Sequence, residues 1–355
     1  MLDSLIAKQH IEKRLAQHAR GIDRADELLL KEAYHDDGTV DYGVFAGSAA
    51  EFAGFLTPVQ ASAPISLHRP SNTWCKVSGD RAVTESYVIA YVVMPTTGDA
   101  QPHLVGGRYL DQHSHKNGEW RMQHRQYILD WCIQYPPAGQ QDTPPAFALV
   151  GAPPRGGHHT ADAGNTLLMA YAATKKPQQE SNAMATDTAI DHALSHQAIT
   201  ELNYRYCRGA DRGDVETLLS AFHDDAVVMS GVFNGCAREF ADTVLPAISG
   251  MCTAHTVTNH WIEIDGDAAV GESYVMAFQG IPGDSPEDRL IGGRYIDRYE
   301  RRDGEWKIAE RSFVMDWAMS EDSKDLLNAG MFEAMNKGCR GDQDPVYALW
   351  NSLNG

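Results

Sequence analysis

The residue types suited to acid–base chemistry occur twice in this chain. Asp23 returns as Asp211 after 188 residues, within a longer repeated segment, and His68 returns as His255 after 187 residues. An imidazole has an unperturbed pKa of about 6.5 and accepts a proton at neutral pH, while a nearby carboxylate can fix its tautomer. Each residue also has a structural interpretation, since aspartate is a favoured helix N-cap and a histidine on a strand is more often structural.

The repeat extends far beyond these four residues. At offsets of 188, then 187, then 186, the repeated segments of the first half lie at residues 19–26, 34–37, 43–45, 51–52, 68–74, 85–87, 106–109 and 125. Two single-residue deletions in loops explain the change of offset. The chain is therefore one domain duplicated, and each functional hypothesis can be tested in two copies.

Length and composition limit the possible functions. A chain of 355 residues suits two domains of about 150 residues each. The formal charge of −18 repels phosphate backbones, so a nucleic-acid partner is not expected. No apolar run approaches the roughly 18 residues of a membrane span, and residues 1–4 do not begin a secretory signal, so we expect no membrane and a cytoplasmic location. The six cysteines form no Cys-x-x-Cys motif, which predicts free thiols.

Hydrophobic periodicity predicts the helices that precede His68. Apolar residues recur at intervals of three and four over residues 11–22, which indicates an amphipathic helix. A second helix is expected to begin at Asp23, with Asp26 as a solvated acid in its first turn, as for Asp214 in the second copy. A third helix is predicted over residues 48–56, ending before Pro58.

From residue 67 the period changes to two, which indicates strands. Strict alternation would place His68, Asn72 and Trp74 on one face of a strand. Turn residues at 78–80 and 116–118 join this strand to an antiparallel meander. Each copy is therefore predicted to be α+β, with helices first and a curved antiparallel sheet after them.

The repeat also sets the domain boundaries. The first domain is expected at residues 1–150 and the second at residues 188–355, including a C-terminal tail. Residues 151–187 are rich in Pro, Gly, Ala and Gln, a composition typical of a flexible linker. The second copy has additional residues before its tail, and a short helix is predicted there at residues 324–337.

This arrangement resembles the SnoaL-like branch of the nuclear transport factor 2-like superfamily. The resemblance rests on the Gly-x-Asp after the first helix, on the histidine that opens the first long strand, and on residues 298–307, which are particularly similar to hexachlorocyclohexane dehydrochlorinase. Scytalone dehydratase and the diarylpropane lyases are further relatives. The similarity covers about residues 5–135 and 190–320 and implies two tandem cone-shaped domains, each with a largely apolar cavity.

The resemblance implies that Asp23 with His68, and Asp211 with His255, form catalytic dyads. In such a dyad the histidine removes a proton and the carboxylate stabilises the imidazolium that forms. Elimination needs little more than a base beside the departing proton and donors beside the leaving group. No metal and no other cofactor is therefore expected.

Polar residues near the expected dyads are candidates for substrate binding: Tyr34, Tyr42, Arg69, Asn72, Arg125, Tyr127, Asn259 and Arg311. Arg125 and Arg311 match an arginine that lines the cavity of the dehydrochlorinase, with a structural salt bridge to an acid such as Asp23 as the alternative. Arg108 and Arg294 are expected to pair with glutamates across the strands. The first copy has tyrosine at three positions where the second has phenylalanine or serine, so its cavity is expected to be the more polar.

The predicted function is a cofactor-independent lyase, namely a dehydratase, dehydrohalogenase or dehydrating deformylase. Its substrate would be a hydrophobic aromatic or polycyclic small molecule. Two alternatives stay open: a SnoaL-like cyclase or isomerase, and a non-catalytic binding or assembly module. The duplicated chain is expected to form an internal pseudo-dimer, and further homo-oligomerisation is left open.

Overall fold

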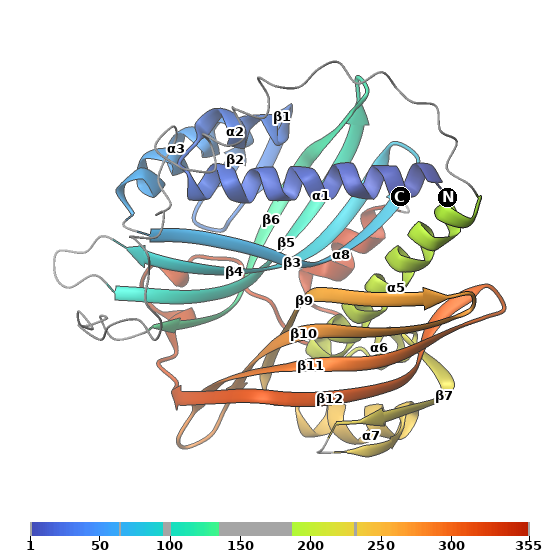
Figure 1. Cartoon of the computed structure of the whole chain (residues 1–355). Coiled ribbons are helices and arrows are strands. Elements are labelled where there is room, and N and C mark those ends of the chain that lie inside the picture. Colours follow the sequence, from blue (N-terminus) through green and yellow to red (C-terminus); the bar gives the residue numbers. More distant parts are fainter. Residues whose placement is uncertain (1, 64, 95–100, 135–186, 231–232, 354–355) are drawn as a thin grey trace, which may run out of the picture.

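The computed structural model describes residues 2–63, 65–94, 101–134, 187–230 and 233–353. The predicted linker at residues 151–187 therefore lies outside the described residues, except for its last residue. The described residues form two copies of one α+β domain, in tandem, as predicted (Figure 1). No helix in this described part is long and apolar enough to cross a bilayer.

In the first copy, three helices pack against a curved six-stranded sheet. The helices are α1 (Leu2–Asp23), α2 (Glu27–Glu32) and α3 (Ala49–Ser62). The strands are β1 (Tyr34–Asp41), β2 (Ala46–Ser48), β3 (Ile65–Ser78), β4 (Arg81–Met94), β5 (Gln101–Lys116) and β6 (Glu119–Gln134). Their order is β2-β1-β6-β5-β4-β3, with β1 parallel to β6 and all other neighbours antiparallel.

The second copy repeats this order and adds a C-terminal segment. Its elements are α5 (Asp187–Arg212), α6 (Val215–Leu219), β7 (Phe222–Met229), β8 (Asn234–Cys236), α7 (Ala237–Ala247), β9 (Cys252–Asp265), β10 (Ala268–Ile281), β11 (Glu287–Arg302) and β12 (Glu305–Asp322). The C-terminal segment contains two 3-10 turns, η2 (Leu326–Asn328) and η3 (Gly330–Phe332), and the helix α8 (Pro345–Ser352). The single helix predicted at residues 324–337 is therefore wrong.

The short-range signals that form these elements are visible in the sequence. The apolar stripe of α1 is buried at Ile11, Leu15 and Ile22. The turn between β5 and β6 places Asn117 and Gly118 at positive φ, as an Asn-Gly hairpin requires. Gly106 lies where the strands β5 and β6 approach closely, because a Cβ there would lie 1.9 Å from the indole of Trp131.

Three local predictions about helix ends are corrected. Asp23 is the last residue of α1 rather than the first residue of the next helix. Asp26 is the N-cap of α2, since its carboxylate accepts the Leu29 N–H at 3.0 Å, and Asp214 caps α6 in the same way. The helix α3 continues through Pro58 to Ser62. Continuation is possible there because the carbonyl that loses its partner belongs to Gly54, an exposed residue.

The prediction that His68, Asn72 and Trp74 share one face is also wrong. The register between β3 and β4 shifts between Pro70 and Thr73, so the alternation of side chains changes phase after His68. The ring of Trp74 packs against Trp350 of α8, at 5.3 Å between ring centroids, on the outer face of the sheet. Only His68 faces the interior of the cone.

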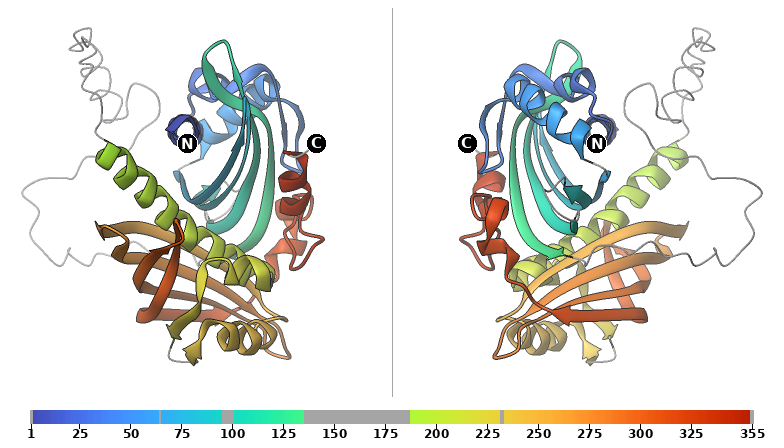
Figure 2. Two further views of the ribbon diagram at one scale, coloured as in Figure 1. Left: turned by 90° about the vertical axis from the view of Figure 1, so that its right-hand side faces the viewer. Right: turned by 90° about the vertical axis from the view of Figure 1, so that its left-hand side faces the viewer.

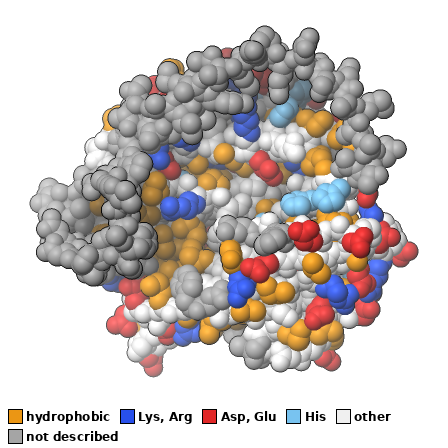
Figure 3. Space-filling view, in the orientation of Figure 1, with side chains coloured by type: hydrophobic (Ala, Val, Ile, Leu, Met, Phe, Trp, Pro, Cys, Tyr) orange, Lys and Arg blue, Asp and Glu red, His pale blue; other side chains and the backbone are white. Residues whose placement is uncertain are grey.

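The two copies are joined by an apolar and polar interface. The helix α5 lies between the two sheets (Figures 1 and 2), and Trp131 stacks on Phe278 with ring centroids 4.6 Å apart. On the face seen in Figure 3, hydrophobic side chains gather over β3–β5, whereas acidic and basic side chains are mixed over β10–β12. The C-terminal segment then returns from β12 to the first copy, where it lies on the side of the first sheet opposite α1 (Figure 2).

All six cysteines carry free thiols.

Candidate active site

The end of α1 and the start of β3 bring Asp23 and His68 together. The Asp23 Oδ1 lies 2.7 Å from His68 Nδ1, and the same carboxylate accepts the backbone N–H of His68 at 2.9 and 3.0 Å. An ionised carboxylate only accepts hydrogen bonds, so His68 Nδ1 carries the proton and Nε2 presents its lone pair. No side chain or backbone group of the described residues bonds to Nε2.

His68 lies in the wall of a cavity of about 310 Å³ inside the first cone. Most of the lining is aliphatic or aromatic, and it includes Ile22, Phe52, Phe55, Leu56, Val88, Ala90, Val92 and Val105. The polar groups of the wall are His68, His103, Gln60 and three tyrosines. Such a site, largely apolar with a few convergent polar groups, is typical of small-molecule binding.

Two of the predicted substrate-binding tyrosines, Tyr42 and Tyr127, line this cavity. Tyr42 is stacked between Phe52 and Tyr127, with ring centroids 4.4 and 5.4 Å apart. Burial raises the pKa of Tyr42 to about 12, and it also raises the pKa of Tyr127, so both phenols stay protonated and can donate. The predicted Tyr34 is buried behind them and does not line the cavity.

Arg125 and Arg311 do not line the cavity that holds His68. Arg125 forms two hydrogen bonds to Asp111, at 2.6 and 2.7 Å, and its guanidinium lies 3.8 Å from the centre of the Tyr109 ring. Arg311 pairs with Asp297 at 2.8 Å in the second copy. The strand register places each arginine opposite its aspartate, so the salt-bridge alternative describes both arginines, although with a different acid from the one expected. Arg108 pairs with Glu85 at 3.0 Å, as predicted.

His18 is a polar residue of this interior that the sequence did not indicate. Arg125 Nη1 donates to His18 Nδ1 at 2.8 Å, so the His18 proton lies on Nε2, which is buried without a partner among the described residues. Burial, and then the charge of Arg125, hold the pKa of His18 well below its usual value. Its position in the buried stripe of α1, one turn before Ile22, was the available signal, but that pattern predicts only burial.

Two further candidates lie outside the cavity. Arg69 follows His68 on β3 and so faces the opposite side, where it is exposed at a groove between the two copies. Asn72 is buried and bonds to the second copy, donating to the His255 carbonyl at 2.8 Å and accepting from Val257 N–H at 2.6 Å. The side chain of Asn259 lies outside the described residues.

The second dyad has the geometry of the first but different neighbours. Asp211 Oδ1 lies 2.6 Å from His255 Nδ1, and Asp211 Oδ2 accepts the His255 backbone N–H at 2.9 Å. The same Oδ2 also accepts the hydroxyl of Tyr87, a first-copy residue, at 3.0 Å. Burial opposes the ionisation of Asp211, but His255 and Arg212 outweigh it, and the pKa of Asp211 is lowered. The first copy therefore supports the second dyad directly, through Tyr87 and Asn72.

Two histidines of β5 have structural contacts. His113 is buried on β5 and its Nε2 lies 2.9 Å from Thr84 Oγ1. His115 Nδ1 lies 3.4 Å from Asp80. Among the described residues, no three His, Cys, Asp or Glu side chains lie together as metal ligands.

Comparison with known families agrees with the duplication. A family model described as the SnoaL-like domain matches residues 3–126 and again residues 191–312, which together are well over half of the chain. This chain belongs to the SnoaL-like family. The second match ends inside β12, so the C-terminal segment of this SnoaL-like protein lies beyond it.

Three solved structures that are similar to this SnoaL-like protein each cover less than half of it. One is a hexachlorocyclohexane dehydrochlorinase (LinA) Type2, with 26% identity and a TM-score of 0.34, covering 38% of this chain and 93% of that one. LinA-type3 from Novosphingobium barchaimii LL02 has 24% identity and a TM-score of 0.34, covering 37% and 93%. The Kfla4162 protein from Kribbella flavida has 22% identity and a TM-score of 0.34, covering 36% and 95%. No curated protein matches this chain.

Proposed function

We propose that the first copy is a cofactor-independent lyase that acts on a hydrophobic aromatic or polycyclic small molecule. One observation carries the proposal: His68 Nδ1 is held by Asp23 at 2.7 Å, which leaves Nε2 as a free base in the wall of an apolar cavity. A base in that setting needs a substrate with an acidic C–H and little charge. The membership of the family and the resemblance to its dehydratases and dehydrochlorinases agree with this reading.

The proposed reaction is a proton-led elimination. His68 Nε2 takes a proton from a substrate carbon, and the electron pair of that C–H bond forms a new π bond. The leaving group departs with its own bonding pair, either as halide or as a hydroxyl oxygen that takes the proton back from the His68 imidazolium and leaves as water. Asp23 stabilises the imidazolium that forms at His68. Tyr42 is the proposed donor of a hydrogen bond to the leaving atom, since its ring lines the cavity and its phenol stays protonated.

The first copy is the better candidate for this chemistry. Its cavity presents phenols at Tyr42 and Tyr127, whereas the second copy has Ser230 and Phe313 at those positions. The second aspartate, Asp211, accepts an additional hydrogen bond from Tyr87 across the interface. That bond supports a structural role for the second dyad in joining the copies.

A test of the proposal needs no knowledge of the natural substrate. The probe 5-nitro-1,2-benzisoxazole carries one acidic C–H: when a base removes this proton, the N–O bond breaks, a nitrile forms and the oxygen becomes a coloured phenolate. We expect the wild-type protein to catalyse this reaction and His68→Ala to lower kcat by about 10²- to 10⁴-fold, the usual contribution of a general base.

The matched control is His255→Ala, which should change kcat much less. Equal losses from the two variants would mean two working sites, and a larger loss from His255→Ala would assign the reaction to the second copy. If both variants retain the wild-type kcat, the proposal is wrong.

A further inference from the structure

The cavity of the first copy includes two residues that come from the far end of the chain. Phe332, the last residue of η3, and Met335 lie among the residues that line the cavity holding His68. Phe332 is 8% exposed and packs in one cluster with Val88, Ala90 and Tyr127. Its ring meets His103 edge to face, with centroids 5.7 Å apart. Phe332 and Met335 belong to the C-terminal segment, which lies beyond the second family match.

The backbone of this segment continues the first sheet. The strand β1 pairs with β6 only as far as Gln126, so the same edge of β6 is open beyond that point. There the Leu129 N–H donates to the Asn336 carbonyl at 2.7 Å, and the Gly338 N–H donates to the Leu129 carbonyl at 3.3 Å. These bonds hold Phe332 and Met335 at a fixed place beside the cavity.

The close approach of the C-terminal segment to the first copy depends on one glycine in the segment and one in the first copy. Gly338 passes Asp130 so closely that a Cβ would lie 2.0 Å from the carboxylate oxygen. Gly43 of the first copy, at φ +76°, lies against the segment, and a Cβ there would lie 2.2 Å from the Ala334 carbonyl oxygen. Side chains at these two positions would force the segment away from the first copy.

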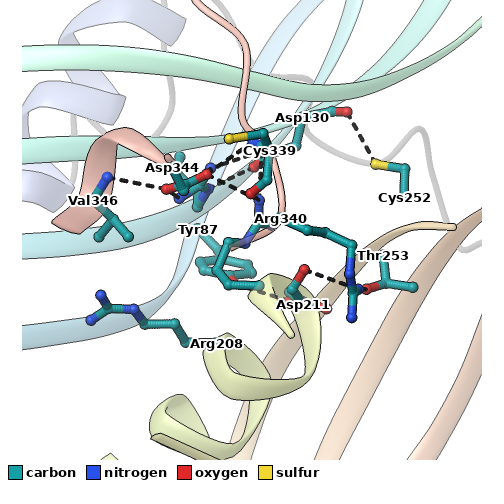
Figure 4. A network of polar contacts seen from close by, with 12 residues as sticks. Tyr87, Asp130, Arg208, Asp211, Cys252, Thr253, Cys339, Arg340, Asp344 and Val346 are labelled. Carbon is teal, nitrogen blue, oxygen red and sulfur yellow. Dashed lines mark hydrogen bonds and ion pairs between the residues drawn. The ribbon is translucent and has the colours of Figure 1, made fainter. Parts of the chain in front are cut away.

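A buried ion-pair network fastens the segment on the outer face of the sheet. Arg108 of the first copy donates to both oxygens of Asp344, at 2.8 and 2.7 Å, and also to Asp130 at 2.9 Å. Asp344 further accepts the Cys339 N–H at 3.0 Å and caps α8 through Val346 (Figure 4). The helix α8 then packs its apolar side against the outer face of the sheet, at Val83, Leu110 and Ile128.

Among the described residues, no segment covers the second copy at the corresponding place. Met315 occupies in β12 the position that Leu129 occupies in β6, yet Met315 is 62% exposed while Leu129 is fully buried. In the part of the chain that the structure describes, the segment therefore lines the cavity of the first copy only.

We infer that the C-terminal segment of the second copy is a wall of the first copy's binding site, and that Phe332 and Met335 are its specificity-determining residues for a hydrophobic ligand. This inference rests on the proposed function for its biological meaning, but the wall can be tested by binding alone. The duplication then has a function: the second copy carries the segment that completes the site of the first.

The experiment measures the affinity of a neutral apolar probe, N-phenyl-1-naphthylamine, whose fluorescence rises on leaving water. In the full-length protein, Phe332→Ala and Met335→Ala should each weaken binding about five- to tenfold, which corresponds to roughly 1 to 1.4 kcal/mol. Phe332→Leu should recover most of the affinity. The matched control Met315→Ala removes an exposed methionine from the second copy and should leave the affinity unchanged.

The same variants separate this inference from the proposed lyase. His68→Ala should abolish turnover of the benzisoxazole while the naphthylamine still binds. For turnover, Phe332→Ala should raise KM more than it lowers kcat, because Phe332 does not touch the proton that moves. If Phe332→Ala and Met335→Ala lose affinity for the naphthylamine while the wild type does not turn over the benzisoxazole, the wall is supported and the lyase is refuted. If Phe332→Ala and Met335→Ala, folded by circular dichroism, both bind the probe like the wild type, the inference is wrong.

Discussion

At the scale of single residues, the paired geometry of Asp23 and His68 matters more than either residue alone. The carboxylate accepts both the ring Nδ1–H and the backbone N–H of His68, so the ring is fixed in position and tautomer. Tyr42 supplies a protonated phenol, since burial raises its pKa to about 12. A base and a protonated phenol therefore belong to the wall of one small apolar cavity.

The role of Tyr42 can be tested by removing one hydroxyl. We expect Tyr42→Phe to lower kcat for the benzisoxazole by on the order of 10²-fold, because a buried donor to a developing oxyanion typically contributes that much. The control is Tyr295→Phe, which removes a hydroxyl from a buried tyrosine of the second copy. Comparable losses from both variants would show that general packing, not donation, explains the effect.

At the scale of elements, one irregularity in β3 decides which residues reach the site. The register shift after Pro70 directs Asn72 and Trp74 away from the cavity and toward the second copy and α8. Two strands away in the same sheet, β5 carries His113, a buried histidine whose ring nitrogen Nε2 contacts Thr84 Oγ1. Burial lowers the pKa of His113 to about 4, so the folded strand holds a neutral imidazole.

His113 should make the free energy of unfolding depend on pH. As the pH falls from 6.5 toward 4, the unfolded chain protonates at position 113 while the folded chain does not, so stability is lost on acidification. The shift corresponds to a loss on the order of 3 kcal/mol across that window. Urea unfolding at pH 7 and pH 4.5 should show a smaller loss in His113→Gln than in the wild type.

A control for this pH effect lies two residues away. His115 is half-buried on the same strand, and His115→Gln should keep the wild-type dependence. An identical dependence in all three proteins would mean that His113 does not titrate in this window.

At the scale of the whole molecule, the two copies are unequal parts of one unit. The first copy contains the cavity that holds His68, and its Tyr87 and Asn72 support the second dyad. The second copy in return supplies the C-terminal segment, anchored by Asp344 to Arg108. Each copy thus contributes side chains to the other.

Removing the charge of Asp344 should destabilise the first copy, although the residue belongs to the second. Asp344→Asn leaves the buried Arg108 without one of its carboxylate partners, and breaking a buried pair typically costs about 3 to 5 kcal/mol. Arg108 keeps Glu85 and Asp130, so we expect the lower end of that range. Urea unfolding followed by fluorescence measures this loss of stability. The control is Asp325→Asn, at an exposed residue of the same segment. A midpoint equal to that of the wild type would show that Asp344 does not anchor the segment.

Much of the architecture could be predicted from local patterns. The repeated residues established the duplication, and the change of period from 3.6 to 2 near residue 67 predicted helices followed by a curved sheet. These signals are local, since periodicity and turn chemistry act over a few residues. The Asp–His pairs came from the family resemblance rather than from spacing, because sequence separation alone does not bring residues 23 and 68 together.

The tertiary structure decided what local patterns do not encode. A bulge of one residue in β3 places Asn72 and Trp74 on faces other than the expected one. The pairing of β5 with β6 places Arg125 opposite Asp111, so the arginine forms an ion pair and does not line the cavity. The wall formed by Phe332 and Met335 joins segments more than 200 residues apart, through backbone bonds and a buried ion pair that only the folded chain assembles. The sequence by itself determined two cones with an acid and a histidine in each. The folded arrangement made the cones unequal, because contacts between distant segments depend on how the whole chain packs.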